Sequence, residues 1–354
     1  MRNRVMTIVG MVLALGVVAA AVVVVVDRIG GEDAERTSLA AALRLAPPDG
    51  VRFSWTDWTG VRRQVGLELT AASPGPAVQD LLDRGFEADL TPSSALGSSA
   101  IVMQERLGFS PATLDWELFT QGPGIAALTM RAGPELDYDF VASSLRETGY
   151  DEPDDADGVW EADPERDDIT SQVTPELNFI ALDRERGLLF ASDTDAGIRG
   201  ALEAAGADDT EALAAALVDA AGAPLSASLY TGDQVCSALA MAHADPSEEQ
   251  AGTTLIAAAG EVNPITGFAI GADAAGDVRV AMSFETEEQA RTNATTRAVL
   301  ATGPAPGQGG DFADRFTLES SRATGRVVTL DLTPQPGAYV LSDLSTGPVL
   351  FATC

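Results

Sequence analysis

An uninterrupted apolar stretch near the start of the chain constrains its architecture most. Residues 5–26 carry no charged side chain and one polar side chain, that of Thr7, with Arg2 and Arg4 before them and Asp27 after them. At 1.5 Å per residue, a helix of this length crosses a hydrocarbon core of about 30 Å. Basic residues favour the cytoplasmic side. We therefore expect a cytoplasmic stub over residues 1–4, a single-pass membrane anchor over residues 5–26, and an extracytoplasmic location for the chain after Asp27.

A cleaved secretory signal is the alternative interpretation of the same stretch. Ala19, Ala20 and Ala21 provide the small residues of a cleavage site after an apolar core of suitable length. Five valines follow Ala21, where a signal normally becomes polar. The pattern therefore favours an anchor that is not removed.

Composition limits the kind of domain and the kind of partner. Hydrophobic residues make up 45% of the 354 residues, which is enough for a buried core and excludes wholesale disorder. The formal net charge of −31 opposes binding to nucleic acid and to anionic membrane surfaces. We therefore expect no nucleic-acid partner, and we interpret the acidic surface as a contribution to solubility.

Strand and helix patterns predict an α+β fold. A stalk is expected over residues 27–46, polar at first and then a short helix with Leu39, Leu43 and Leu45 on one side. Pro47 and Pro48 end it, because neither can continue a helix. A hairpin followed by a helix is expected at residues 178–205 and again at 266–300, with a third copy at 316–332 and a short helix from Ala338. This repetition predicts two modules of antiparallel sheet with helices packed on one face, over residues 47–222 and 223–354.

Several kinds of chemistry are excluded by missing residues. The chain contains no lysine, so it has no Walker A loop and no Schiff-base site. Its one histidine, His243, cannot build a zinc site with further histidines and has no Gly-x-Ser-x-Gly partner for a hydrolase triad. We predict no catalytic, cofactor-binding or metal-binding residues, and we interpret His243 as a helix-end or surface residue.

The acidic loop at residues 151–158 has some resemblance to a calcium loop. If Gly158 is the required sixth residue, the first ligand position is Pro153 and the twelfth is Pro164, and neither can serve as a ligand. A solvated loop is therefore preferred, with a nonstandard cation site left open.

The two cysteines, Cys236 and Cys354, are predicted to form a disulfide. Both follow the anchor, where the compartment can be oxidising, and an even count permits one intramolecular pairing. The bridge would hold the last residue of the chain against the second module. Two unrelated thiols are the competing interpretation.

Three segments resemble one group of proteins: residues 53–58 (FSWTDW), 303–310 (GPAPGQGG) and 345–354 (STGPVLFATC). The chain resembles exported, membrane-anchored actinobacterial proteins that have no assigned activity. The resemblance implies a cell-envelope location and carries over no catalytic residue. Together with the exclusions above, it indicates a non-enzymatic extracytoplasmic binding or scaffolding region. Another envelope protein and an apolar ligand are the candidate partners, and a carboxylate-based envelope hydrolase is the alternative class.

Overall fold

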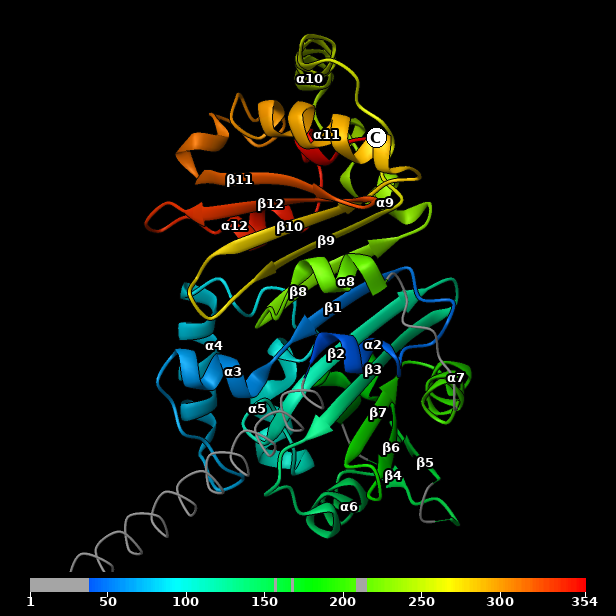
Figure 1. Ribbon diagram of the computed structural model, residues 1–354. Helices are drawn as coiled ribbons and strands as arrows, with labels where there is room; N and C mark the ends of the chain where they lie inside the picture. The colour runs from blue at the N-terminus through cyan, green and yellow to red at the C-terminus, as the bar shows by residue number, and fades with distance from the viewer. Residues whose placement is uncertain (1–37, 156–157, 167–168, 208–214) are drawn as a thin grey trace, which may run out of the picture.

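The computed structural model describes residues 38–155, 158–166, 169–207 and 215–354, which form an α+β fold around one large antiparallel sheet (Figure 1). The predicted anchor at residues 5–26 lies outside the described residues. Among the described helices, none has the length and apolar character needed to cross a membrane.

The sheet has twelve strands in the order β11-β12-β10-β9-β8-β1-β2-β3-β7-β6-β5-β4. All adjacent strands run antiparallel. The strands are β1 (Arg52–Thr56), β2 (Leu114–Gly122), β3 (Ile125–Ala132), β4 (Tyr150–Asp151), β5 (Val159–Ala162), β6 (Phe179–Asp183), β7 (Leu188–Ser192), β8 (Ser226–Thr231), β9 (Gly267–Ala272), β10 (Val278–Ser283), β11 (Phe316–Thr324) and β12 (Val327–Pro334).

Strand β1 pairs with β8 at the centre of the sheet and joins its two halves. Reading outward from this joint, β1-β2-β3-β7-β6 on one side matches β8-β9-β10-β12-β11 on the other. The pair Ser54–Ser228 lies in the middle of the joint. The repeated unit is thus a strand, a helical region, a hairpin, a helix and a second hairpin, which is larger than the hairpin-plus-helix unit expected from sequence. The two expected modules contribute to one continuous sheet.

The three predicted hairpins are present as β6–β7, β9–β10 and β11–β12. Their turns contain Gly187, Gly276 and Gly325, with φ values of 68°, 84° and 56°. Side chains with a Cβ rarely adopt this left-handed region, so glycine is the residue that these tight turns require. The alternation of residues and the turn chemistry together account for the correct prediction.

Helices cover both faces of the sheet, so the expectation of one helical face was wrong. On one face, α2 (Leu39–Leu43), α7 (Asp195–Ala205) and α8 (Ala215–Ala221) pack over a core that includes the neighbouring, mutually tilted rings of Trp55 and Trp116. Because residues of α2 are buried in this core, the expectation of a stalk was wrong for residues 39–46. The central strands carry apolar residues on both sides, and each side needs a cover. The opposite face is covered by α3 (Trp58–Gln64), α4 (Gly75–Glu87), α6 (Tyr138–Glu147), α9 (Gln234–Leu239), α11 (Glu287–Leu300) and α12 (Val340–Leu344).

Two segments outside the regular helices and strands also help to build the fold. Residues 97–107 form a short 3₁₀ turn, the three-residue α5 (Ala100–Val102) and a π-helical turn at Met103–Leu107. The loop at residues 301–310 is anchored by side chains. Glu248 accepts the N–H of Gly307 at 2.8 Å, and Arg315 donates to the carbonyls of Gln308 and Gly309. The remaining helix, α10 (Pro246–Ala259), packs on α11.

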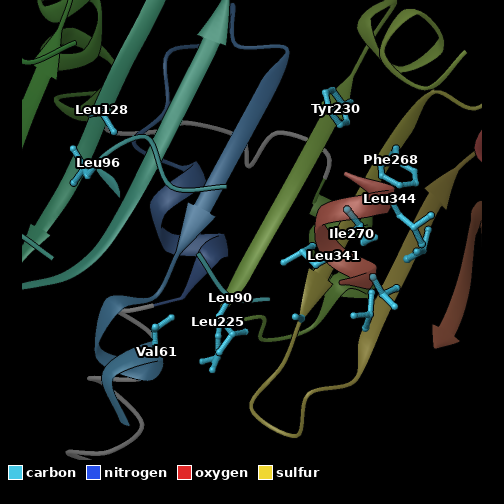
Figure 2. Packing of buried hydrophobic residues seen from close by; sticks show 14 of the residues in the cluster. Val61, Leu90, Leu96, Leu128, Leu225, Tyr230, Phe268, Ile270, Leu341 and Leu344 are labelled. Atoms are coloured by element: carbon cyan, nitrogen blue, oxygen red, sulfur yellow. The ribbon is translucent and has the colours of Figure 1, made fainter. Parts of the chain in front are cut away.

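Residues 88–96, which follow α4, form a bridging segment. It lies over the centre of the sheet, on the face opposite α2, α7 and α8. Its Leu90 and Leu96 are buried in the same core cluster as Leu225 and Leu128, and Figure 2 shows these side chains beside the central strands. Ser93 lies 3.0 Å from Ser228 of β8, measured between their hydroxyl oxygens. The bridging segment therefore contacts strands of both halves of the sheet.

Candidate functional site

The candidate site is a cleft beside α3, the short helix that follows central strand β1. Asp57 caps this helix, with its carboxylate accepting the N–H of Gly60 at 2.8 Å. Burial raises the pKa of Asp57, and the hydrogen bond from Gly60 opposes the increase. Gly60 is required here because a Cβ at this position would lie 2.3 Å from a methyl carbon of Leu225. Helix α3 thus sits unusually close to the start of the second half of the sheet.

Two consecutive residues of α3 are held by two acidic residues of β2. The indole Nε1 of Trp58 donates to Oε2 of Glu117 at 3.0 Å, and Oγ1 of Thr59 donates to Oδ1 of Asp115 at 3.0 Å. Trp58 and Glu117 have no exposed surface. These bonds fix the start of α3 to the sheet.

Arg62 fixes the other end of α3. Its Nη1 donates to the carbonyls of Pro111 and Leu114 at 2.5 and 2.8 Å, and its Nη2 donates to Thr59 at 3.0 Å. Burial lowers the pKa of Arg62, and the charge of Asp115 opposes the decrease. Because these three acceptors occupy its guanidinium, Arg62 forms part of the wall, whereas the next residue, Arg63, is exposed.

The cleft has a volume of about 810 Å³ and opens to solvent. The lining comes from α3, from the segment at residues 66–71, which is neither helix nor strand, and from residues 112–115 and 133–135. The lining mixes apolar, neutral polar and charged side chains of both signs. Its residues are Thr59, Arg62, Arg63, Gly66, Leu67, Glu68, Leu69, Thr70, Ala71, Ala112, Thr113, Asp115, Gly133, Pro134 and Glu135.

Hydrogen bonds hold the cleft-lining segment at residues 66–71 near both of its ends. The N–H of Leu67 donates to the carbonyl of Arg62 at 2.9 Å, and Nε2 of Gln104 donates to the carbonyls of Thr70 and Ala71 at 3.2 and 3.0 Å. In the part of the chain that the structure describes, the backbone N–H groups of Glu68 and Leu69 have no hydrogen-bond partner. This segment therefore presents free backbone donors between fixed ends.

The predicted disulfide pair lies in the second half of the sheet. Cys236 of α9 and Cys354 are joined, with their Cα atoms 5.5 Å apart. Residues of this tail are also held by the buried Arg297, whose Nη1 donates to the carbonyls of Phe351 and Thr353 at 2.7 and 2.9 Å. This pairing agrees with the sequence prediction and has a structural role in the fold.

His243 and the acidic loop do not contribute to the cleft. His243 ends a 3₁₀ turn and is exposed, with its Nε2 2.6 Å from the carbonyl oxygen of Ser237, so it is a surface residue as expected. In the acidic loop, Asp151 forms an ion pair with Arg166 and Glu152 forms one with Arg146. Residues 156 and 157 lie outside the described residues. Among those described, no group of three or more His, Cys, Asp or Glu side chains has the arrangement of a metal site.

Sequence reasoning missed Glu117 and the α3 cleft. Glu117 lies in the segment Trp116–Glu117–Leu118–Phe119, whose alternation resembles a strand with one solvated face. The alternation could have revealed the strand. It could not reveal that a helix and the bridging segment cover this face.

Comparisons with known proteins give no family assignment. No family model matches the chain, and no curated protein matches it. Among solved structures, the chain is similar to the one titled "Structure of crystal form I of TP0453", with a TM-score of 0.42 and 7% sequence identity over 86% of this chain and 96% of that chain. A similarity at this level carries no conclusion about activity. The resemblance to exported actinobacterial proteins stays a prediction.

Proposed function

We propose that this chain is a non-enzymatic, membrane-anchored envelope protein whose extracytoplasmic region binds an extended peptide segment in the α3 cleft. The observation that carries the proposal is that, among the described residues, the N–H groups of Glu68 and Leu69 in the cleft-lining segment 66–71 have no hydrogen-bond partner. An extended peptide that lies along this segment gains main-chain hydrogen bonds, as in strand addition to an open edge.

The mixed lining also favours a peptide over a purely apolar ligand. Leu67 and Leu69 offer apolar contact from the wall, and both are partly buried against the core. The exposed Arg63 can pair with a carboxylate, and the exposed Glu68 and Glu135 can pair with a cation. A peptide has both charges and a polar backbone, whereas a lipid tail would leave these groups unpaired.

Three carboxylates line the cleft, those of Asp115, Glu68 and Glu135, and the contacts of Asp115 give less support to a hydrolase. Asp115 accepts a hydrogen bond from Thr59 and anchors α3, so it has a positioning role. A glycoside-cleaving pair needs two carboxyl groups facing one bond, one as acid and one as base or nucleophile. The binding interpretation uses the groups that are exposed in the cleft.

A peptide library displayed on phage, selected on the full chain in lipid nanodiscs, tests the proposal. The best selected peptide is then titrated against the wild type and two variants. Ala71→Trp fills the α3 cleft and should weaken binding at least about tenfold. Ala223→Trp, an exposed alanine lining a smaller cleft of about 310 Å³ elsewhere on the sheet, is the matched control and should bind like the wild type. Equal binding by wild type and Ala71→Trp contradicts the proposal, as does a failure to select any peptide.

The anchor and its orientation have a separate test. Arg2 and Arg4 precede residues 5–26, so the cleft should face the outside of the membrane. Protease added to intact protoplasts should digest the region after Asp27. Full protection would contradict this orientation, and a soluble form released without protease would favour a cleaved signal.

A further inference from the structure

Glu117 occupies a position at which the second half of the sheet has a phenylalanine. Ser54 and Ser228 are equivalent at the central joint, so Thr56 is equivalent to Tyr230 two residues further along. Thr56 pairs with Glu117 in β2, and Tyr230 pairs with Phe268 in β9. Both partners then pair with a methionine, Met130 for Glu117 and Met282 for Phe268. The topology is therefore compatible with an apolar side chain at this position, and the carboxylate needs a separate explanation.

The two carboxylate oxygens of Glu117 hold two different elements. Oε2 accepts the indole N–H of Trp58 in α3, and Oε1 accepts the backbone N–H of Ala95 in the bridging segment at 2.9 Å. Burial raises the pKa of Glu117 to about 7, while hydrogen bonds from Trp58, Ser94, Ala95 and Leu96 oppose the increase. Both protonation states are thus accessible near neutral pH.

The surroundings of Glu117 can accept the proton that the neutral form would donate. Thr56 and Ser226 lie next to Glu117 on the same face, in one row across β2, β1 and β8. Among the described residues, their hydroxyl oxygens are buried without a hydrogen-bond partner. A proton added from solvent to Oε2 forms an O–H group that needs an acceptor, and the hydroxyl of Thr56 is the neighbouring one.

The groups that face Glu117 are not ionisable. They are the indole of Trp58 from α3, the hydroxyl of Thr56 from β1 and the thioether of Met130 from β3. The bridging segment adds the hydroxyl of Ser94 and the backbone N–H groups of Ala95 and Leu96. The nearest charged groups in sequence on these elements are Asp57 and Arg62 of the α3 region and Asp115 of β2, which form the hydrogen bonds described above. Arg131, next to Met130 on β3, lies over the ring of Trp116 and donates to the carbonyl of Arg186. Glu117 itself is therefore the group that titrates at this contact.

We infer that Glu117 is a proton-controlled clamp that regulates the α3 cleft. In the ionised form both oxygens accept hydrogen bonds, and α3 is held in the position seen here with Thr59, Arg62 and Arg63 along the cleft. Protonation of Oε2 removes its negative charge and directs a new O–H group toward Thr56, which weakens Oε2 as the acceptor of the Trp58 indole N–H and loosens this wall. This regulation rests on the proposed peptide-binding function. The clamp predicts that the peptide binds more tightly at higher pH.

Nuclear magnetic resonance of the indole N–H groups tests the clamp without any ligand. In the full chain in nanodiscs, the Trp58 resonance, assigned by its loss in Trp58→Phe, should shift with a midpoint near pH 7. The shift should be absent in Glu117→Gln, because an amide does not titrate. The indole of Trp55, which donates to the carbonyl of Pro224 at 3.0 Å, is the internal control. A Trp58 resonance that stays constant from about pH 5.5 to about pH 8.5 while the protein remains folded overturns the clamp.

Peptide titrations test the regulation separately. The selected peptide should bind the wild type about tenfold more tightly at about pH 8.5 than at about pH 5.5, which corresponds to a one-unit fall in the pKa of Glu117 on binding. Trp58→Phe lacks the indole donor and should bind equally at both pH values; it also replaces Glu117→Gln if that variant fails to fold. Binding by the wild type that does not change with pH overturns the regulation alone. Absence of peptide binding at every pH overturns the proposed function, while the Trp58 titration still reports on the clamp.

Discussion

The carboxylate of Asp89 caps a helix that begins 251 residues later in the chain, α12, whose second residue is Leu341. Asp89 accepts the N–H of Leu341 at 2.6 Å and that of Ser342 at 3.1 Å. The residue before α12, Tyr339, makes no side-chain cap of its own. Asp89 also lies in the bridging segment, so one buried side chain connects the segment after α4 to the last helix of the second half.

Replacement of Asp89 by alanine should lower the free energy of unfolding by about 1–3 kcal/mol, because it leaves buried N–H groups of α12 without an acceptor. Urea denaturation followed by circular dichroism measures the change. Glu87→Ala, an exposed change at the end of α4, is the control and should stay within about 0.5 kcal/mol of the wild type. Equal losses in the two variants would show that the cap does not stabilise the fold.

Glu117 should make the protein less stable as pH rises. Its pKa is about 7 in the fold and 4.5 as an ordinary carboxyl, so the neutral form is favoured by folding. The stabilisation is fully present below about pH 4.5 and is lost as pH rises through about 7. The loss amounts to about 3 kcal/mol.

The measurement is the difference in unfolding free energy between wild type and Glu117→Gln at several pH values. The amide does not ionise, so the wild type should lose stability relative to the variant between about pH 4.5 and about pH 8. Other carboxyls titrate equally in both proteins and cancel in the difference. A constant difference across this range would mean that Glu117 has an ordinary pKa.

Arg297 should be one of the least replaceable residues in the second half. It is fully buried, its pKa is lowered to about 9 by burial, and it donates to the carbonyls of Asn263, Phe351 and Thr353. Arg297→Met should cost about 3 kcal/mol or more, because three buried carbonyls lose a charged donor. The matched control is Arg291→Met on the same helix, an exposed residue with a Glu287 partner 3.9 Å away. Thermal unfolding that is equally affected in both variants would contradict this role.

The disulfide has a direct chemical test. Alkylation of the denatured, unreduced protein followed by mass measurement should add no label, and reduction first should add two. The bridge closes a loop with a sequence separation of 118, for which chain entropy gives an upper value of about 4–5 kcal/mol. Two labels without reduction would show free thiols instead.

The sequence predicted the local elements better than their assembly. Hairpins such as β6–β7 were predictable because two short apolar runs flank a turn with Gly187, all within about fifteen residues. The pairing of β1 with β8 could not be predicted. Ser54 and Ser228 are 174 positions apart, and no local signal selects one partner strand over another. The prediction of a single helical face was wrong for a related reason. The sequence shows that residues such as Trp55 and Leu229 are apolar, but it does not show which helix packs on them.

The candidate site was hidden for a different reason. A glutamate in an alternating strand normally indicates the solvated face, and the cover over Glu117 comes from Trp58 and Ala95, far from it in sequence. The disulfide was predictable because two cysteines allow one pairing. No comparable argument predicts a cleft that is formed by α3 and three segments separate in sequence.

The central joint has a consequence for the stability of fragments. A chain cut between α8 and β8 leaves two pieces, each with a complete row of backbone donors and acceptors exposed along β1 or β8. Since the two rows match around the Ser54–Ser228 pair, each exposed edge is a template for a second copy of the same piece. We therefore expect separated halves to self-associate through these edges, whereas in the intact chain each of these edges is covered by the other half.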